Sequence, residues 1–341
     1  MKILATGIGS LPHKTSDEAC EFILNNFVNI PFWPQLPKTS FLESMYAQYS
    51  EGMPCVVIDN ENQKIYFQIE DDITSELEKF YERIIADDVD FFQITEQYAA
   101  GLHHFLNLQL TTNNLQLAAV KGHITGPISF GLTVVDQNKR AIFYHEHFKD
   151  VIVKALAMKA RWQVRQLKKF SNEIIIFVDE PYLASFGSAF VSLQREEVIN
   201  AVNEVVGAIH QEGAKSAIHC CGNTDWGLLM DTEVKIISFD AYEYFDSFAL
   251  YPERLKEYLN RGGMLAWGIV PASDKINQET SEAIAARFHR GVKVLVDKGI
   301  DEDKLLAQSL ITPSCGVGSL PQETAERVIS LTCEVSNEIS R

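Results

Sequence analysis

Ser216-Ala217-Ile218-His219-Cys220-Cys221-Gly222 is the stretch on which the interpretation of the fold rests. A short apolar run that ends in a histidine and two cysteines, followed by glycine, predicts a buried strand that carries soft metal ligands into a loop. Side chains two residues apart in an extended segment point to the same side, so His219 and Cys221 can share one ion and Cys220 should face away. Ordinary core packing is the alternative, because free cysteines are commonly buried.

A histidine and a thiolate do not complete a zinc site, so further ligands have to come from elsewhere in the chain. Cys315, in Thr312-Pro313-Ser314-Cys315-Gly316, is the candidate. Two thiolates and one imidazole suit zinc better than magnesium or calcium. Three protein ligands with a replaceable fourth position form a catalytic arrangement, in which Zn2+ could hold a substrate thiol as its nucleophilic thiolate.

Apolar segments followed by helical patterns recur along the whole sequence. Strands are expected near residues 3, 30, 118, 174, 216, 236, 264 and 307. Strands that alternate with helices pair in parallel through right-handed crossovers, and eight such units favour a closed (β/α)8 TIM barrel. A doubly wound sheet with an appended hairpin is the alternative. Residues 1–341 contain no linker-like shift in composition, which predicts a single α/β domain.

The connection between the second and third expected strands is long enough to hold an insertion. The second strand is expected over 29–36, and the insertion that follows is expected to hold a helix over 40–50, a β-hairpin of strands 56–59 and 64–68, and helices over 76–85 and 95–108. The hairpin is predicted because turn-forming residues separate its two strands. Near the end of the chain, the eighth strand is expected over 305–311.

The composition is that of an ordinary globular protein, with 46% hydrophobic and 22% charged residues among 341. Its 30 basic and 46 acidic residues give a formal net charge of −16, which argues against nucleic acid or an anionic membrane surface as a partner. No run approaches the roughly 20 apolar residues of a membrane span, and the first residues lack a signal-peptide core, so a cytoplasmic protein is expected. Six scattered cysteines favour reduced thiols over a disulfide framework.

Polar residues follow the expected strands at their carboxyl ends, which is where a (β/α)8 barrel carries its active site. Asp179 and Glu180 could form an acid/base pair or serve substrate binding and structure. His13 and His123 also lie beside strand ends, where each could line the pocket or be a satisfied structural histidine. The whole set at the strand ends is Ser10, Gly126, Pro127, Asp179, Glu180, His219, Cys221, Asp240 and Cys315.

Four motifs together resemble the catalytic carboxy-terminal barrel of cobalamin-independent methionine synthase, in the superfamily that also holds uroporphyrinogen decarboxylase. They are Ile8-Gly9-Ser10, Asp179-Glu180-Pro181, His219-x-Cys221 and Cys315-Gly316, and in this order they cover nearly the whole chain. The resemblance implies that His219, Cys221 and Cys315 bind the zinc that activates homocysteine. It also implies that the Ile8-Gly9-Ser10 loop contacts the amino acid part of homocysteine and that Asp179 binds its ammonium group.

The fourth ligand and the folate site depart from this family. Asp240 stands where the family has a glutamate ligand and is one methylene shorter, so it could ligate zinc, act through water or leave the position open. Gly126-Pro127-Ile128-Ser129 resembles the family's Gly-Pro-Val-Thr loop, which makes Gly126, Pro127 and Ser129 pocket candidates. Phe130 lies near the place of the tryptophan that stacks on folate.

Two further departures bear on the substrate and the donor. Pro34-Gln35-Leu36-Pro37-Lys38 stands in place of the family's His-Gly-Glu motif, and the amino-terminal half of the full-length synthase has no counterpart in this sequence. His219-Cys220-Cys221-Gly222-Asn223-Thr224 also resembles the zinc motif of corrinoid-dependent thiol methyltransferases. This motif, the missing folate-stacking tryptophan and the missing amino-terminal half favour methylcobalamin or a methylated corrinoid protein as the donor over methyltetrahydrofolate.

The expected function is therefore a zinc-dependent transfer of a methyl group to a small thiol, with homocysteine giving methionine. Three alternatives remain: methyl transfer from a methylcobamide to another thiol, a metal-free decarboxylase like uroporphyrinogen decarboxylase, and a non-catalytic metal- or corrinoid-binding module. The decarboxylase would need arginines at the barrel mouth to bind its acidic tetrapyrrole, and the strand ends offer none.

Overall fold

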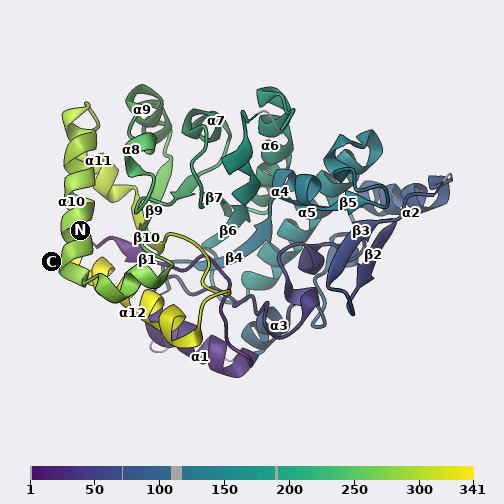
Figure 1. The fold of residues 1–341 in the computed structure, drawn as a ribbon, viewed down its shortest axis with the longest axis horizontal. Helices are drawn as coiled ribbons and strands as arrows, with labels where there is room; N and C mark the ends of the chain where they lie inside the picture. Colours follow the sequence, from purple (N-terminus) through teal and green to yellow (C-terminus); the bar gives the residue numbers. More distant parts are fainter. Residues whose placement is uncertain (1, 71, 109–116, 189–190) are drawn as a thin grey trace.

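Seven parallel strands form a curled sheet at the centre of the protein (Figure 1). The computed structural model describes residues 2–70, 72–108, 117–188 and 191–341. The spatial order of the strands is β1 (Leu4–Ala5), β10 (Ser309–Pro313), β9 (Met264–Val270), β8 (Ile236–Phe239), β7 (Lys215–Cys220), β6 (Ile174–Asp179) and β4 (Val120–Thr125). From β4 to β10, each strand of this sheet pairs in parallel with the next strand of the sheet along the chain, as alternating strands and helices predict.

Residues 29–36 lie between β1 and β4, where the sequence predicts a second strand. They form single bridges instead of a ladder, with Phe32 opposite Lys121 and Gln35 opposite Ser10. The prolines at positions 31 and 34 have no N–H to donate, which explains why a regular ladder does not form here. The expectation of a regular second strand is thus wrong, and an eight-stranded closed barrel stays a prediction.

Helices follow the strands and cover the outer face of the sheet (Figure 1). The helices next to the strands are α1 (Ser16–Asn26), α5 (Glu146–Leu167), α6 (Arg195–Gln211), α9 (Pro252–Asn260), α10 (Ser281–Asp297) and α12 (Gln322–Ile339). Inside the curl lies a separate small core that includes Phe177, Ala217, Ile236, Ala266 and Leu310. Because side chains alternate along a strand, this inner core fixes which residues of each strand face the interior.

A second, three-stranded sheet lies beyond β4. The hairpin of β2 (Val56–Asp59) and β3 (Lys64–Phe67) is antiparallel, and β5 (Val135–Asp136) joins β3 in parallel. This part of the chain also contains α2 (Thr74–Ile85), α3 (Ala100–Asn107), α4 (Pro127–Thr133) and the 3-10 turn η3 (Val89–Phe92). In Figure 1 the hairpin and α2 lie at the opposite side of the molecule from both chain termini.

Two expected elements differ from the structure for local reasons. The helix expected over 40–50 is replaced by two 3-10 turns, η1 (Phe41–Glu43) and η2 (Ala47–Tyr49), because Ser44 between them is extended (φ −72°, ψ 155°). The strand expected over 305–311 begins only at Ser309. The preceding residues form α11 (Glu302–Ala307), where the Asp301 side chain accepts the N–H of Lys304 at 2.7 Å as an N-cap.

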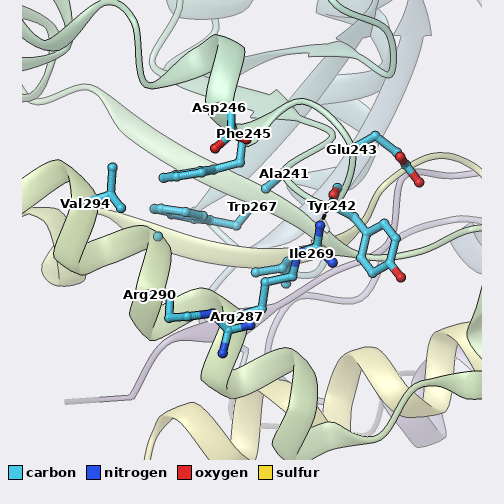
Figure 2. A pocket seen from close by; sticks show the side chains of 11 residues that line it. Ala241, Tyr242, Glu243, Phe245, Asp246, Trp267, Ile269, Arg287, Arg290 and Val294 are labelled. Carbon is cyan, nitrogen blue, oxygen red and sulfur yellow. Dashed lines mark hydrogen bonds between the residues drawn. The ribbon is translucent and has the colours of Figure 1, made fainter.

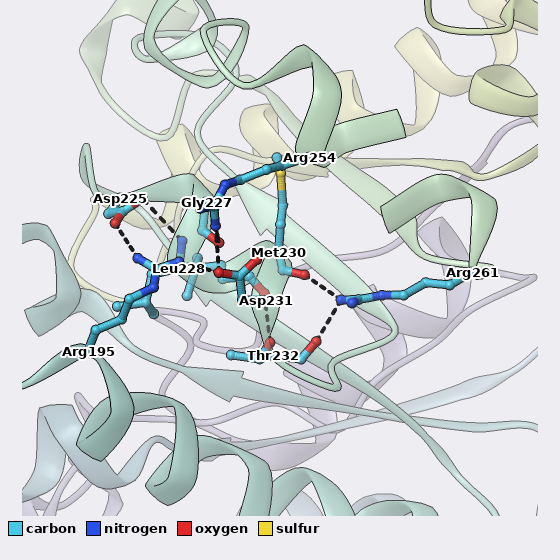
Figure 3. Close-up of polar contacts among 10 residues, drawn as sticks. Arg195, Asp225, Gly227, Leu228, Met230, Asp231, Thr232, Arg254 and Arg261 are labelled. Atoms are coloured by element: carbon cyan, nitrogen blue, oxygen red, sulfur yellow. Dashed lines mark hydrogen bonds and ion pairs between the residues drawn. The ribbon is translucent and has the colours of Figure 1, made fainter. Parts of the chain in front are cut away.

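An arginine network holds the short helix α7 (Trp226–Asp231), which follows the loop after β7 (Figure 3). Arg195 of α6 pairs with both Asp225 and Asp231 at 2.6 Å, and Arg254 of α9 pairs with Asp231 at 2.5 Å. Arg261 donates to the carbonyl oxygens of Met230 and Thr232. The loop that begins at Cys221 ends at Asp225, and the pairing of Asp225 with Arg195 fixes that end.

None of the helices in the described ranges combines the length and apolar character that crossing a bilayer requires.

Candidate metal centre

His219, Cys221 and Cys315 come together at the carboxyl ends of the strands. His219 lies on β7, Cys221 directly follows that strand, and Cys315 lies two residues beyond β10. One ligand atom from each side chain lies within 4.8 Å of the other two. Zinc ligands lie about 2.0 to 2.3 Å from the ion, so atoms this close need little movement to share one. Across the four described ranges, this is the one His/Cys/Asp/Glu group that could hold a metal.

The imidazole of His219 is oriented for ligation by its neighbour on β8. The Nδ1 atom lies 3.0 Å from the Oγ atom of Ser238, which is directly opposite His219 in the strand register. The Nε2 atom is buried and has no hydrogen-bond partner. A ligating histidine commonly uses its second nitrogen in this way, which fixes the ring and leaves the other nitrogen free for the metal.

The two cysteines of the group are electrostatically linked. The interaction with the neighbouring Cys315 thiol, together with that of His219, lowers the pKa of Cys221 to about 4 despite its burial. The same interaction raises the pKa of Cys315. The neighbouring Cys220 packs into the core on the outer side of the sheet, with its Sγ atom 3.5 Å from the carbonyl oxygen of Gly222. The prediction that Cys220 faces away from the pair is confirmed.

Asp240 lies outside this three-residue group, although it follows β8 as expected. Its carboxylate accepts the backbone N–H of Glu243 at 2.8 Å and so stabilises the turn after the strand. Burial raises the pKa of Asp240 to about 6. The structure therefore gives Asp240 a local role in the loop, and its direct ligation of a metal stays a prediction.

A cavity of about 280 Å³ opens beside the three ligand side chains. Ile8 and Ser10 line it from the loop after β1, and Asp179 and His123 line it from β6 and β4. Asp179 is opposite His219 in the strand register, and one of its carboxylate oxygens is buried without a partner. Burial raises the pKa of Asp179 to about 6, although His219 and Lys121 oppose this shift. Four of the candidates from the sequence thus lie around one hollow, and their part in binding stays a prediction.

Glu180 is turned away from this cavity and holds the start of α4. Its carboxylate accepts the N–H groups of Ile128 at 2.9 Å and Ser129 at 2.7 Å, and the Ser129 hydroxyl at 2.6 Å. Gly126 makes room for this contact, because a Cβ atom there would lie 2.1 Å from the Glu180 carboxyl carbon. An acidic side chain at a helix N-terminus is stabilising. Burial raises the pKa of Glu180 to about 7.

Several expected pocket residues therefore have structural positions instead. Gly126, Pro127, Ser129 and Glu180 build the β4–α4 junction, and none of them lines the cavity. His13 is also outside the cavity wall, where it packs against Phe22 and lies 3.5 Å from a Glu326 oxygen on α12. These side chains follow the strands at their carboxyl ends, as predicted, but the space inside the curl holds only some of the residues found there.

The site also contains residues that the sequence analysis missed. Ser238 had a usable signal, since it lies two residues before Asp240 on β8 and so faces the same side. Gln35, Met45 and Tyr49 line the cavity from the irregular segment between β1 and β4. Gln35 belongs to the segment 34–38 that the motifs had singled out, whereas nothing in the local sequence pattern indicates the positions of Met45 and Tyr49, because this segment has no regular period.

Comparison with solved structures shows the fold to which this site belongs. The chain is similar to a B12-independent methionine synthase from Shewanella sp. W3-18-1 in complex with selenomethionine, with a TM-score of 0.55, 14% identity, and coverage of 99% of this chain and 98% of that one. This likeness shows a methionine synthase-like fold. A pneumococcal exo-β-D-N-acetylglucosaminidase module is more distant, with a TM-score of 0.44, 8% identity, and coverage of 99% and 86%. No family model and no curated protein sequence matches the chain.

Proposed function

We propose that this chain is a zinc-dependent methyltransferase of the methionine synthase core type, built as a single (β/α)8 barrel, that methylates a small thiol. The observation that supports this most directly is the convergence of His219, Cys221 and Cys315 within 4.8 Å from two distant parts of the sequence. The unpartnered Nε2 atom of His219 and the soft donor set both fit zinc. The similarity to a methionine synthase agrees with this proposal at the level of the fold.

In the proposed site, His219, Cys221 and Cys315 hold the metal, and Ser238 fixes the His219 ring. Zinc bound there would lower the pKa of an incoming thiol and keep it as a thiolate. Asp179 faces the cavity with a free carboxylate oxygen and would bind the ammonium group of homocysteine. Ser10 and the backbone of Ile8 would position the rest of the amino acid. The thiolate would attack the methyl carbon in line, so that the S–C bond forms as the carbon–cobalt bond of the methylcorrinoid breaks and the corrinoid leaves with the electron pair; positioning supplies much of the rate of such a reaction.

The cavity size bears on how the methyl donor approaches. At about 280 Å³ the cavity is below the roughly 300 to 1,000 Å³ of pockets that enclose drug-sized ligands. It suits a small amino acid thiol and is too small to enclose a corrinoid or a folate as well. We therefore propose that the donor, a methylcorrinoid, presents its methyl group at the mouth of the cavity. Among the described residues, no Arg or Lys lines the cavity. This disfavours an acidic tetrapyrrole as substrate, because its carboxylates would need basic side chains.

The proposal is tested by a methyl-transfer assay on the zinc-loaded protein. Homocysteine is supplied with either methylcobalamin or methyltetrahydrofolate, and methionine is measured by mass spectrometry together with bound zinc by elemental analysis. We expect one zinc per chain and methionine formation from methylcobalamin. A protein that binds no zinc and methylates no thiol from either donor would refute the proposal, whereas transfer from methyltetrahydrofolate alone would refute only the choice of donor.

A further inference from the structure

His123 is a buried histidine in the cavity wall whose ring nitrogens have no hydrogen-bond partner. Its exposed fraction is 2%, it lines the cavity beside the metal-ligand group, and both Nδ1 and Nε2 are unpaired. Buried polar atoms in folded proteins almost always have a partner. An imidazole left unpaired in the wall of a hollow is therefore placed to bind something that enters the hollow.

The ring of His123 is held rigidly by its surroundings. It stacks on Trp33, with ring centroids 3.8 Å apart and an interplanar angle of 24°. It also packs on Gly9, where a Cβ atom would lie 2.8 Å from the Cε1 and Nδ1 atoms of the ring, so only glycine fits there. These contacts cover the flat surfaces of the imidazole, whose two nitrogens lie buried at its edge without a hydrogen-bond partner.

Three hydrogen bonds fix the position of Trp33 relative to the His123 backbone. The Trp33 indole donates to the Gln163 side chain at 3.1 Å, and the amide of Gln163 donates to the His123 carbonyl oxygen at 3.0 Å. The Tyr49 hydroxyl donates to the same carbonyl at 3.0 Å. A binding group whose orientation is set in advance loses little freedom when its ligand arrives.

One basic residue, Lys121, lies close to His123 on β4, and one acidic residue, Asp179, lines the same cavity. Lys121 lies two residues earlier on the same face of β4, where its ammonium donates to the Ile8 carbonyl at 2.5 Å and lies 4.3 Å from the Phe177 ring centroid. It is fully buried and does not reach the cavity wall. Burial, with the Lys121 charge, lowers the pKa of His123 well below its usual value, so the ring is neutral and has one N–H to donate.

We propose that His123 donates a hydrogen bond to the carboxylate of the acceptor thiol and thereby selects thiols that carry a carboxylate. The packing of His123 on Gly9 places it beside the Ile8–Ser10 loop, at which the amino acid end of the acceptor would lie. This inference rests on the proposed function, because it assigns a specificity-determining residue to the same cavity. No proton is transferred in this step, because the neutral imidazole only donates a hydrogen bond from its N–H to the carboxylate.

The test is a comparison of two thiols in the zinc-loaded protein and in His123→Phe, which keeps the stacking ring and removes the nitrogens. For homocysteine we expect the KM to rise about 10- to 100-fold, the usual effect of losing a hydrogen bond to a charged group. For 2-mercaptoethanol, which has no carboxylate, the KM should change less than about twofold. Bound zinc should remain at one per chain.

Two further variants make the result interpretable. His123→Asn keeps a side-chain N–H and should recover part of the homocysteine affinity, which a purely packing role of the ring would not allow. His13→Gln changes a histidine of similar burial outside the cavity and should leave both KM values unchanged. An equal change in KM for both thiols, or none, would overturn the role of His123 while leaving the zinc methyltransferase in place. Absence of zinc binding and thiol methylation in the unaltered protein would overturn both proposals.

Discussion

Two hollows of similar volume on this protein differ in whether the buried polar groups that line them have hydrogen-bond partners. The cavity beside His219, Cys221 and Cys315 has a volume of about 280 Å³, and a second hollow between the loop after β8, strand β9 and helix α10 has about 310 Å³ (Figure 2). In the first, buried nitrogen and oxygen atoms of His219, His123 and Asp179 have no partner. Their volumes therefore do not indicate which of the two hollows is a binding site.

The second hollow contains polar groups that are already engaged within the protein. Arg287 lies over the Tyr242 ring at 4.1 Å and donates to the Tyr242 carbonyl at 2.5 Å, as Figure 2 shows. The Tyr242 hydroxyl donates to Glu279 at 2.6 Å. The stacked rings of Phe245 and Trp267 form its apolar side, at a centroid distance of 5.8 Å. Unpaired buried polar atoms cost free energy in an empty fold, so the presence of three such side chains at the first hollow supports the proposal that a ligand binds there.

The largest effect is expected when one of the two cysteine ligands beside the first hollow is replaced. Replacing Cys221 or Cys315 by serine should lower zinc affinity by more than about 100-fold, beyond the loss seen when only a supporting residue is changed, and should abolish methyl transfer. Zinc is measured by elemental analysis after dialysis, and methionine by mass spectrometry. Cys220→Ser is the matched control, because Cys220 is adjacent in sequence and faces the opposite side of the sheet. Full zinc retention in both ligand variants would contradict the proposed centre.

A smaller effect is expected from the residue that supports His219. Ser238→Ala removes the hydroxyl that contacts the Nδ1 atom at 3.0 Å and leaves the three ligands intact. We expect zinc affinity to fall about 10- to 100-fold with the fold preserved, because outer partners orient a ligating imidazole. Competition with a chromophoric zinc chelator measures this change, and circular dichroism checks the fold. Unchanged affinity would mean that the strand backbone alone orients His219.

The smallest effect is expected in the second hollow. The double change Arg287→Ala and Arg290→Ala removes both guanidinium groups, which are exposed on α10. Zinc content, methyl transfer and both KM values should be unchanged, and the free energy of unfolding should fall by about 1 to 2 kcal/mol because the contacts of Arg287 with Tyr242 are lost. Urea denaturation measures the stability. A loss of methyl transfer in this variant would show that the second hollow takes part in the reaction and would break the contrast between the two.

Much of the scaffold follows from local patterns in the sequence. The sequence predicts a strand over 236–239 and helices over 195–211, 252–260 and 281–297, and β8, α6, α9 and α10 have these bounds because each has a regular apolar period and clear ends. The segment 29–52 could not be predicted in this way. Its prolines and capping serines favour turns and single bridges, and its position is set by contacts with β1 and β4 that lie far away in sequence.

The same distinction applies to the candidate site. The two-residue spacing of His219 and Cys221 by itself determined that they share a face and that Cys220 does not, since the alternation of side chains is a local property of any strand. Only the tertiary structure decided that Cys315 joins them, that Glu180 turns to cap α4, and that His123 but not His13 faces the cavity. These outcomes depend on the order and curl of the strands, because the space inside the sheet is limited and neighbouring elements compete for it.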